Sequence, residues 1–364
     1  METRAKARDY MMSDLGLLRG YAISQSLFSP TTLKAAICRL GFVQADPIRS
    51  PARAQDLILR HRVKGYRAGD LDRKYPSLDI EEDVLYAYGF LPRTVWQLLH
   101  PRNLRGMSKL EKEVLKTVSK FGVMHPTELQ EHFGGARVVN AWGGYSKATT
   151  LALEDLHYRG LLRIARRENG IRLYEPVKAS TEGISADERL RKLVMLMIGI
   201  LSPISERSLL SNRARFRYLG SVRPIVRELL KRGELESQTV DGIQYLLPAS
   251  TRRATEPSRT VRFLAPFDPV VWDRKRFEHF WGWPYRFEAY TPPAKRVRGY
   301  YAMPLLWCDA VIGWVNAKVH EDRLNVEVGF VKNAPTDPDF KRELQAEIVR
   351  LQTFLDPSSC NLSI

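Results

Sequence analysis

A glutamine and an aspartate two residues apart, Gln44 and Asp46, are the residues of this sequence whose types and spacing best suit a reaction. Both residue types can take part in catalysis, since a carboxylate can accept a proton and a carboxamide both donates and accepts hydrogen bonds. The segment Gly41 to Asp46 is expected to be extended, and alternate residues of an extended chain point to the same side. The spacing therefore predicts that the two side chains share one face.

Asp46 also has a purely structural interpretation. It precedes a proline, and Asp-Pro pairs often begin turns. The chain has further examples at Asp268-Pro269, Asp337-Pro338 and Asp356-Pro357. The Q-x-D spacing by itself does not distinguish a reactive pair from a turn.

Two helices are expected to flank the extended stretch and so to position the pair. The first covers Thr31 to Leu40 and ends at Gly41, and the second covers Pro51 to Lys64. In the second helix, steps of seven and four residues return nearly to the same face, which gathers three basic residues into one stripe. These are Arg53, Arg60 and Lys64. We therefore expect a basic surface beside Gln44 and Asp46.

The middle of the chain contains an internal repeat, which appears when Arg159-Gly160 is aligned with Arg232-Gly233. Each copy predicts three helices, a glycine stop and a two-stranded hairpin. The first copy has helices at 108–121, 126–133 and 146–159 and a hairpin at 161–174. The second copy has helices at 186–201, 205–212 and 221–232 and a hairpin at 235–247. The turn sequences, Asn169-Gly170 and Asp241-Gly242, are strong hairpin signals.

Three helices followed by a hairpin is the order of the winged helix, a helix-turn-helix variant whose third helix can enter the major groove of DNA. Winged helices also serve as protein-binding modules and spacers, so the order alone does not fix the use. In the second copy the third helix carries three cations on one face: Arg223, Arg227 and Lys231. This face suits contacts with phosphate.

The first copy distributes its charge differently. Its third helix carries Glu154 and Asp155, which would repel phosphate. Its arginines lie in the hairpin instead: Arg163, Arg166, Arg167 and Arg172. We assign the DNA contact of this copy to the hairpin, although a hairpin that is merely solvated would carry the same charges.

The bulk composition narrows the class of partner. Lysine and arginine total 57 against 41 aspartate and glutamate in 364 residues, and the net charge of +16 favours a polyanion such as nucleic acid. The N-terminal residues lack the apolar core of a signal peptide, and the longest apolar run, Leu193 to Leu201, is far below the roughly 20 residues of a membrane span. The three cysteines are far apart and the histidines dispersed, which indicates a reducing compartment and no metal site. We expect a cytoplasmic protein that binds neither a membrane nor a metal.

The last third of the chain is rich in aromatic residues and is expected to form an antiparallel sheet. Alternating patterns predict strands at 286–290, 299–307, 311–319 and 324–331, followed by a helix at 340–354. The segment 250–262, with Arg252, Arg253, Arg259 and Arg262, is expected to be the linker into this region. The predicted fold class is α+β, with units at 1–105, 106–180, 181–250 and 251–364.

A proline-containing block precedes this sheet. Phe267 and Trp272 are expected in its core, beside a turn set by the prolines. Four cations near the block are candidates for phosphate contact, with a solvated surface role equally compatible: Arg274, Arg276, Lys295 and Arg296.

Three sequence blocks, taken together, carry a family resemblance. They are G-F-V-Q-A-D-P-I-R with the following P-A-R-A-Q-D-L-I-L-R-H-R-V, then L-A-P-F-D-P-V-V-W-D-R-K-R, then P-P-A-K-R-V-R-G-Y-Y-A-M-P-L-L. In this order, with winged helices between them, they resemble the AlkZ/YcaQ family of bacterial winged-helix DNA glycosylases over about residues 15–355. The family has a Q-x-Q motif in its azinomycin-resistance branch and Q-x-D in its YcaQ-like branch, which acts on a wider set of N-alkylated purines and unhooks interstrand crosslinks. The Q-A-D of this chain fits the second branch.

The resemblance implies that Gln44 and Asp46 carry the reaction, on the concave face of a C-shaped array of tandem winged helices. A purine alkylated at N7 is cationic and already a good leaving group, so it needs no protonation. Asp46 would stabilise the oxocarbenium sugar and take a proton from water, while Gln44 would position that water. No lysine nucleophile or cofactor is required, so the implied enzyme is monofunctional.

The implied partner is double-stranded DNA with alkylation damage, bound by a monomer at the bacterial nucleoid. The candidate DNA contacts are basic residues from all parts of the chain: Arg49, Arg53, Arg60, Lys64, Arg166, Arg167, Arg223, Arg227, Arg274, Arg276, Lys295 and Arg296. The sequence departs from the family at Gln55-Asp56, where many relatives carry a histidine-containing stretch. Asp56 could be a second acid at the site, or it could pair with Arg53 and Arg60 along the helix.

A second class of function fits the winged helices and the charge without the motif. A non-catalytic DNA-binding protein, such as a transcriptional regulator, would use the same modules, usually as a dimer on paired half-sites. Such a protein would bind one DNA sequence irrespective of lesions, and Gln44 and Asp46 would be replaceable.

Overall fold

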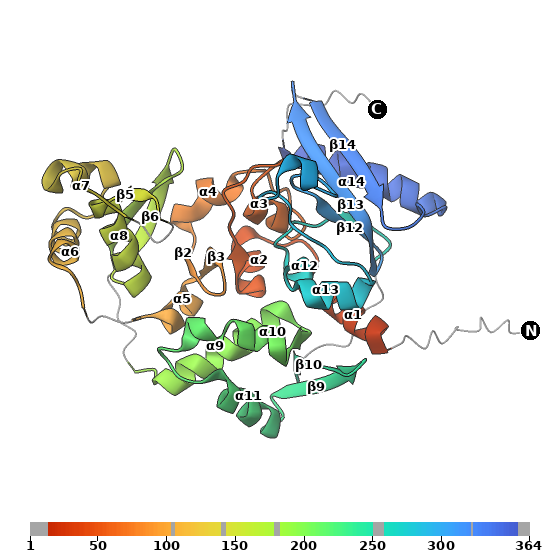
Figure 1. The fold of residues 1–364 in the computed structure, drawn as a ribbon, viewed down its shortest axis with the longest axis horizontal. Helices are drawn as coiled ribbons and strands as arrows, with labels where there is room; N and C mark the ends of the chain where they lie inside the picture. The colour runs from red at the N-terminus through yellow and green to blue at the C-terminus, as the bar shows by residue number, and fades with distance from the viewer. Residues whose placement is uncertain are drawn as a thin grey trace, which may run out of the picture.

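The structure of the chain is a computed structural model that describes residues 14–102, 106–139, 143–177, 183–249, 258–321 and 323–355. Mixed helices and small antiparallel sheets build it, which confirms the predicted α+β class (Figure 1). Several residues of the sequence interpretation lie outside the described residues: Arg252, Arg253, Asp356, Pro357 and Cys360.

The first unit holds the Q-x-D motif between a helix and a loop. Its elements are α1 (Asp14–Ser26), α2 (Leu33–Leu40), β1 (Val43–Gln44), α3 (Ala54–Leu59), α4 (Asp70–Lys74), β2 (Ile80–Val84), β3 (Tyr88–Pro92) and α5 (Arg93–Leu99). The side chain of Thr32 caps α2 by accepting from the Ala35 N–H. Gly41 ends the helix with a left-handed φ of 72°, as the sequence predicts. The chain therefore enters β1 directly after a fixed helix end.

The second flanking helix is much shorter than the predicted range of 51–64. Only Ala54–Leu59 is helical, and the chain then turns. Two arginines of this turn reach inward to partners late in the sequence. Arg60 binds Glu347, and the fully buried Arg62 forms a two-bonded ion pair with Asp268 at 2.8 and 3.0 Å. These distant contacts override the helical periodicity, so the stripe of three cations does not form.

The second unit confirms the predicted helices and hairpin. Its elements are α6 (Lys109–Phe121), α7 (Pro126–Phe133), β4 (Arg137–Val139), β5 (Tyr145–Lys147), α8 (Ala148–Arg159), β6 (Leu162–Glu168) and β7 (Ile171–Pro176). A reciprocal capping box between Ser108 and Glu111 starts α6. The small hairpin β4–β5 is not predicted, and it delays the start of α8 from Ser146 to Ala148.

The third unit repeats the same order. Its elements are α9 (Ala186–Leu201), β8 (Ile204–Ser205), α10 (Glu206–Ser211), α11 (Val222–Lys231), β9 (Leu235–Val240) and β10 (Ile243–Pro248). The hairpin turns of the second and third units each place an Asn-Gly or Asp-Gly pair at positive φ, as two-residue hairpins require. The predicted repeat of three helices and a hairpin is therefore confirmed in both copies.

The first unit follows the same plan, which the sequence pattern conceals. Its sheet has the order β1-β3-β2, and the third unit has the matching order β8-β10-β9. In the second unit a single antiparallel bridge, Met124 to Tyr174, takes the place of the first strand. The units differ after that strand: Ser205 is followed at once by α10, whereas residues 45–53 separate β1 from α3. Asp46 lies in this additional loop.

The C-terminal region is a sheet backed by a helix. Its elements are β11 (Val261–Phe263), α12 (Pro269–Trp272), α13 (Arg274–Trp281), β12 (Met303–Trp307), β13 (Ala310–His320), β14 (Arg323–Phe330) and α14 (Pro338–Leu355), with the sheet order β11-β12-β13-β14. The predicted strand at 286–290 is wrong. That segment is irregular because the Glu288 carboxylate accepts the backbone N–H groups of Val297, Arg298 and Gly299, which folds the loop on itself.

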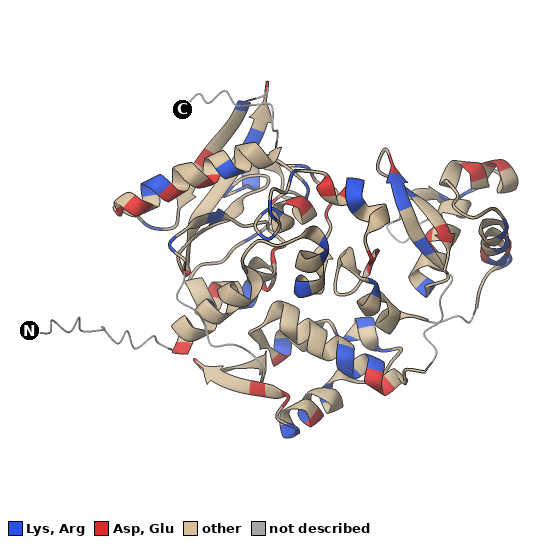
Figure 2. Ribbon diagram, turned by 180° about the vertical axis from the view of Figure 1, so that it is seen from behind, with Lys and Arg blue, Asp and Glu red and all other residues tan. Residues whose placement is uncertain are grey.

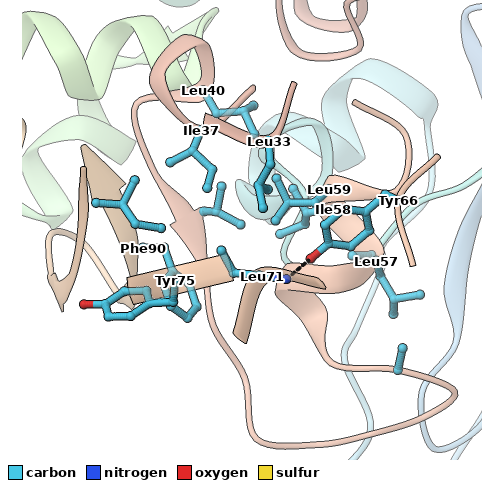
Figure 3. Close-up of a cluster of buried hydrophobic side chains, with 14 of the residues drawn as sticks. Leu33, Ile37, Leu40, Leu57, Ile58, Leu59, Tyr66, Leu71, Tyr75 and Phe90 are labelled. Atoms are coloured by element: carbon cyan, nitrogen blue, oxygen red, sulfur yellow. Dashed lines mark hydrogen bonds between the residues drawn. The ribbon is translucent and has the colours of Figure 1, made fainter. Parts of the chain in front are cut away.

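The first unit lies at the centre of the molecule, with the other units around it (Figure 1). Leu33, Ile37 and Leu57 belong to a core that continues into the second unit and the C-terminal sheet (Figure 3). A second core joins α5 of the first unit to α9 of the third. The strand that carries Gln44 is therefore anchored from several directions.

Candidate active site

Strand β1 is held against β3 by close backbone contact. Gln44 is paired in register with Gly89, and the Ala45 N–H donates to the Tyr88 carbonyl at 2.9 Å. A Cβ atom at Gly89 would lie 2.3 Å from the Val43 carbonyl oxygen and 2.9 Å from the Gln44 Cα. Only glycine permits this approach.

Gln44 is oriented by a tryptophan from the C-terminal region. The Trp272 Nε1–H donates to the Gln44 Oε1 at 3.0 Å. The indole of Trp272 packs edge-on against Tyr86 at 4.7 Å, and Tyr86 packs against Phe42 at 4.7 Å. With its oxygen engaged, the amide directs its NH2 group away from the indole, and no partner of that NH2 is seen among the described residues.

Trp272 packs against the core, as the sequence predicts, but it is only half-buried. Its contact with Gln44, across 228 positions of sequence, is not predicted. In the sequence, Trp272 stands out only as part of the block L-A-P-F-D-P-V-V-W-D, whose apolar stretch is short. Nothing in its spacing indicates which residue the indole meets.

One carboxylate oxygen of Asp46 stabilises a turn, and the other is free among the described residues. Its Oδ1 accepts the Ile48 N–H at 2.9 Å, which is the Asp-Pro turn expected from the sequence. No donor to Oδ2 is seen in the part of the chain that the structure describes. Burial raises the pKa of Asp46, and the hydrogen bond from Ile48 opposes that rise. The carboxylate is therefore half-buried, fixed on one side and open on the other.

The departure at Gln55-Asp56 has a structural role. The Oε1 of the buried Gln55 accepts the Asp46 N–H at 3.3 Å and so supports the loop. Asp56 accepts from the Tyr66 hydroxyl at 2.8 Å and from the Gly69 N–H at 3.1 Å. Asp56 forms no ion pair with Arg53 or Arg60 within the described residues, although the charge of Arg53 acts on its pKa, and its hydrogen bonds fix a neighbouring turn.

A phenol that the sequence does not indicate lies near Asp46. Tyr301 is 2% exposed, and its hydroxyl has no hydrogen-bond partner among the described residues. Burial, and next the negative charge of Asp46, raise the pKa of this phenol well above its usual value. The ring packs at right angles on Phe287, with the centroids 5.2 Å apart. Tyr301 therefore brings an unused hydroxyl into the surroundings of the carboxylate.

Two predicted DNA contacts, Arg60 and Arg276, are wrong. The Arg60 guanidinium, with a side chain 3% exposed, binds Glu347 and the Phe263 carbonyl. Arg276, 2% exposed, donates to backbone carbonyls that join α12 to the third unit: Leu201, Pro203, Pro269 and Val270. Both guanidinium groups are buried and bind partners inside the protein, so they are not available to contact DNA.

The hairpin of the second unit also uses its arginines internally. Arg167 binds the buried Glu82 of β2, and Arg163 binds Glu81 at 2.9 Å. Arg172 lies over the Tyr88 ring at 4.5 Å. These contacts attach the hairpin to the first unit, so most of the expected basic cluster is a bridge between units. Arg166, paired with Glu168, is the exposed member.

The remaining candidates keep some access to solvent. On α11, Arg223 and Arg227 are exposed while Val222, Val226 and Leu229 are buried, which is the predicted division of that helix. Arg49, Lys64 and Lys295 are also exposed. Arg53, Arg274 and Arg296 are half-buried, and Arg53 pairs with Asp72 at 2.5 Å. Basic and acidic residues are interspersed over all the units (Figure 2).

Neither a metal centre nor a membrane segment emerges from the residues that the structure describes. They contain no group of three or more histidine, cysteine, aspartate or glutamate side chains placed to hold a metal ion. No helix in the described ranges is long and apolar enough to cross a membrane.

The chain belongs to the AlkZ-like DNA glycosylase family, whose model matches residues 37–354, and the family resemblance drawn from the sequence is thereby confirmed. Among solved structures, the fold is similar to that of Streptomyces sahachiroi DNA glycosylase AlkZ, with a TM-score of 0.61 over 92% of this chain and 96% of that one. The two are 14% identical, so this likeness concerns the fold.

Proposed function

We propose that this glycosylase removes N-alkylated purines, in particular N7-alkylpurines, through Gln44 and Asp46. The two side chains have complementary unused groups: the NH2 of an amide whose oxygen is bound by Trp272, and the Oδ2 of Asp46. This complementarity is the observation that supports the proposal most strongly. One water could accept a hydrogen bond from Gln44 and donate one to Asp46.

In that arrangement the Gln44 NH2 group donates to the water oxygen, and a proton of the same water points to the Asp46 carboxylate. Burial raises the pKa of Asp46, which makes it a better proton acceptor than an exposed aspartate. The same negative charge would stabilise the oxocarbenium sugar as the bond to the base breaks. An N7-alkylpurine leaves as a neutral base, so no acid is needed, and the product would be an abasic site.

The proposed substrates include bulky adducts and interstrand crosslinks, as in the Q-x-D branch that this motif resembles. We propose that the three helix-and-hairpin units are winged helices in a C-shaped array whose concave face carries Gln44. The exposed cations of α11, Arg223 and Arg227, would bind phosphates of the duplex. We further propose a monomeric bacterial enzyme acting at the nucleoid, with the units divided near residues 105, 180 and 250.

An excision assay tests the proposed substrate and the role of Gln44. Duplexes containing N7-methylguanine or a nitrogen-mustard crosslink are incubated with the parent protein and with Gln44→Ala, and abasic sites are then cleaved with alkali. We expect strand breaks with the parent protein above the spontaneous rate and a loss of about 100- to 1000-fold with the variant, in the range found for groups that position or stabilise a reacting centre. Equal activity of the variant would contradict the role given to Gln44.

A further inference from the structure

A basic cavity of about 640 Å³ opens in the C-terminal region, between α13 and the irregular segment that follows it. We call it the basic cavity. Its lining includes four cationic residues: Arg274, Arg286, Lys295 and Arg298. Two glutamates also line it, Glu278 and Glu288. The volume is in the range of sites that bind a small ligand or part of a larger one.

The two glutamates balance the four cations only in part: the positive charge of Arg298 contributes to lowering the pKa of Glu288, but the lining keeps more cations than carboxylates. Glu288 is 4% exposed, and one of its oxygens accepts three backbone N–H groups from the facing loop, so it holds the cavity wall in place. Glu278 is exposed on α13. No ion pair joins either glutamate to a cation of the lining within the described residues. The cavity therefore presents excess positive charge to solvent.

The cations have unused hydrogen-bonding capacity. Arg286 and Lys295 are exposed, and no side-chain partner of either is seen in the described ranges. Arg298 lies over the rings of Trp283 at 4.9 Å and Trp314 at 5.5 Å, which fixes its plane. Its buried Nε has no acceptor. Arg286 and Lys295 therefore carry the donors that an anion entering the cavity could bind.

Arg274 contributes positive charge to the basic cavity, but both of its NH2 groups already donate hydrogen bonds within the protein. Its guanidinium donates to the Val271 and Pro266 carbonyls at 2.7 and 2.8 Å and lies 4.6 Å over the Tyr285 ring. It is thus a fixed positive wall of the basic cavity.

The basic cavity lies behind one aromatic layer from the catalytic pair. Tyr285 and Phe287 line it, and the Tyr285 hydroxyl donates to the Ala302 carbonyl at 2.6 Å. Phe287 packs its ring on Tyr301, a buried phenol whose pKa is raised by burial and then by the negative charge of Asp46. An anion in the cavity would therefore lie close to a DNA strand engaged at Asp46.

We propose that the basic cavity binds a backbone phosphate of the DNA strand beside the lesion. This inference rests on the proposed function for its relation to the lesion. The cavity does not suit the damaged base itself, because an N7-alkylpurine is cationic and the lining would repel it. Two exposed hydrophobic side chains, Val297 in the lining at 77% exposure and Tyr290 at 78%, whose ring packs on the lining residue Phe287, favour a nucleotide strand over a small free anion.

The test is the salt dependence of binding to undamaged duplex DNA. We compare the parent protein, the double variant Arg286→Ala/Lys295→Ala, and Lys341→Ala, an exposed cation on α14 that does not line the cavity. Each phosphate contact contributes about 0.9 to the slope of log affinity against log salt. Loss of one or two contacts should reduce the slope of the double variant by about 1 to 2 and leave that of Lys341→Ala unchanged. Both variants replace exposed side chains, and thermal unfolding checks that they remain folded.

Equal slopes for the double variant and Lys341→Ala would overturn the proposal. Competition by inorganic phosphate at the same phosphate-group concentration as DNA would also overturn it, since it would indicate a free-anion site. Because undamaged duplex requires no excision, this experiment is independent of the catalytic assignment. A protein that shows the slope change but excises nothing would contradict the proposed function and leave the phosphate site standing.

Discussion

Replacing Trp272 by phenylalanine removes the hydrogen bond that orients Gln44 and keeps an aromatic ring against Tyr86. The bond joins two uncharged groups at 3.0 Å, and such bonds contribute about 0.5–1.5 kcal/mol. A factor of ten in rate corresponds to about 1.36 kcal/mol. The bond holds the Gln44 amide in the orientation proposed for the reaction, so without it this free energy must be supplied on reaching the transition state, and excision should slow by about 2- to 13-fold.

Single-turnover excision from an N7-methylguanine duplex measures this effect, because enzyme in excess separates the chemical step from product release. Affinity for DNA should stay the same, since Trp272 carries no charge. The matched control is Trp281→Phe, which loses an indole bond of 2.9 Å to the Asp309 carbonyl away from Gln44. The reasoning is refuted if Trp272→Phe excises at the parent rate, or if Trp281→Phe is slowed to the same extent.

Three further predictions concern the strand, the acid and the arginines. Gly89→Ala should reduce both excision and the melting temperature, because its Cβ would meet the backbone of β1 at 2.3 Å. Excision should fall as pH drops through the raised pKa of Asp46 and reach a plateau above it, since the proposed base acts when deprotonated. Arg167→Ala should lower the free energy of unfolding in urea by about 1–3 kcal/mol, because it leaves the buried Glu82 short of a partner, with little effect on DNA affinity. Arg223→Ala should do the reverse, weakening DNA binding without loss of stability.

Each of these has a clear opposite result. Normal activity and stability of Gly89→Ala would mean that β1 can move without consequence. A rate that is constant from pH 4 to 8, or that rises as pH falls, would remove Asp46 as the base. Weaker DNA binding by Arg167→Ala, at unchanged stability, would restore the hairpin as a DNA contact and contradict its assignment as a bridge.

The sequence predicts those parts of the fold that depend on neighbouring residues. The helices Pro126–Phe133 and Ala186–Leu201 begin and end where their caps and apolar periodicity indicate. The two hairpin turns follow from Asn-Gly and Asp-Gly, which accept the positive φ of such turns. These signals are local, and the structure retains them.

The sequence fails where a partner lies far along the chain. The helix predicted over 51–64 is cut short because Arg60 and Arg62 bind residues more than 200 positions away. A basic residue on a helical pattern is expected at the surface, and only the folded chain shows that Arg276 is enclosed by carbonyls. The arginines of the hairpin β6–β7 in the second unit are predicted as DNA contacts for the same reason, because their acidic partners lie in the first unit.

The candidate site divides in the same way. The extended backbone at Gln44 and the Asp-Pro turn at Asp46 follow from spacing and residue type. The contact from Trp272 and the unused hydroxyl of Tyr301 come from the C-terminal region and have no local signature. The sequence therefore indicates the two groups proposed to react, while their contacts depend on tertiary structure.

The most direct test of the central claim is the excision of N7-methylguanine by the parent protein and by Asp46→Asn under single-turnover conditions, with duplex binding measured in parallel. Asparagine keeps the oxygen that accepts from Ile48 and removes the negative charge and the base. The account predicts alkali-labile sites with the parent protein, a near-spontaneous rate with the variant, and similar affinity for DNA. Undiminished excision by a folded Asp46→Asn protein would contradict it, as would a parent protein that never exceeds the spontaneous rate.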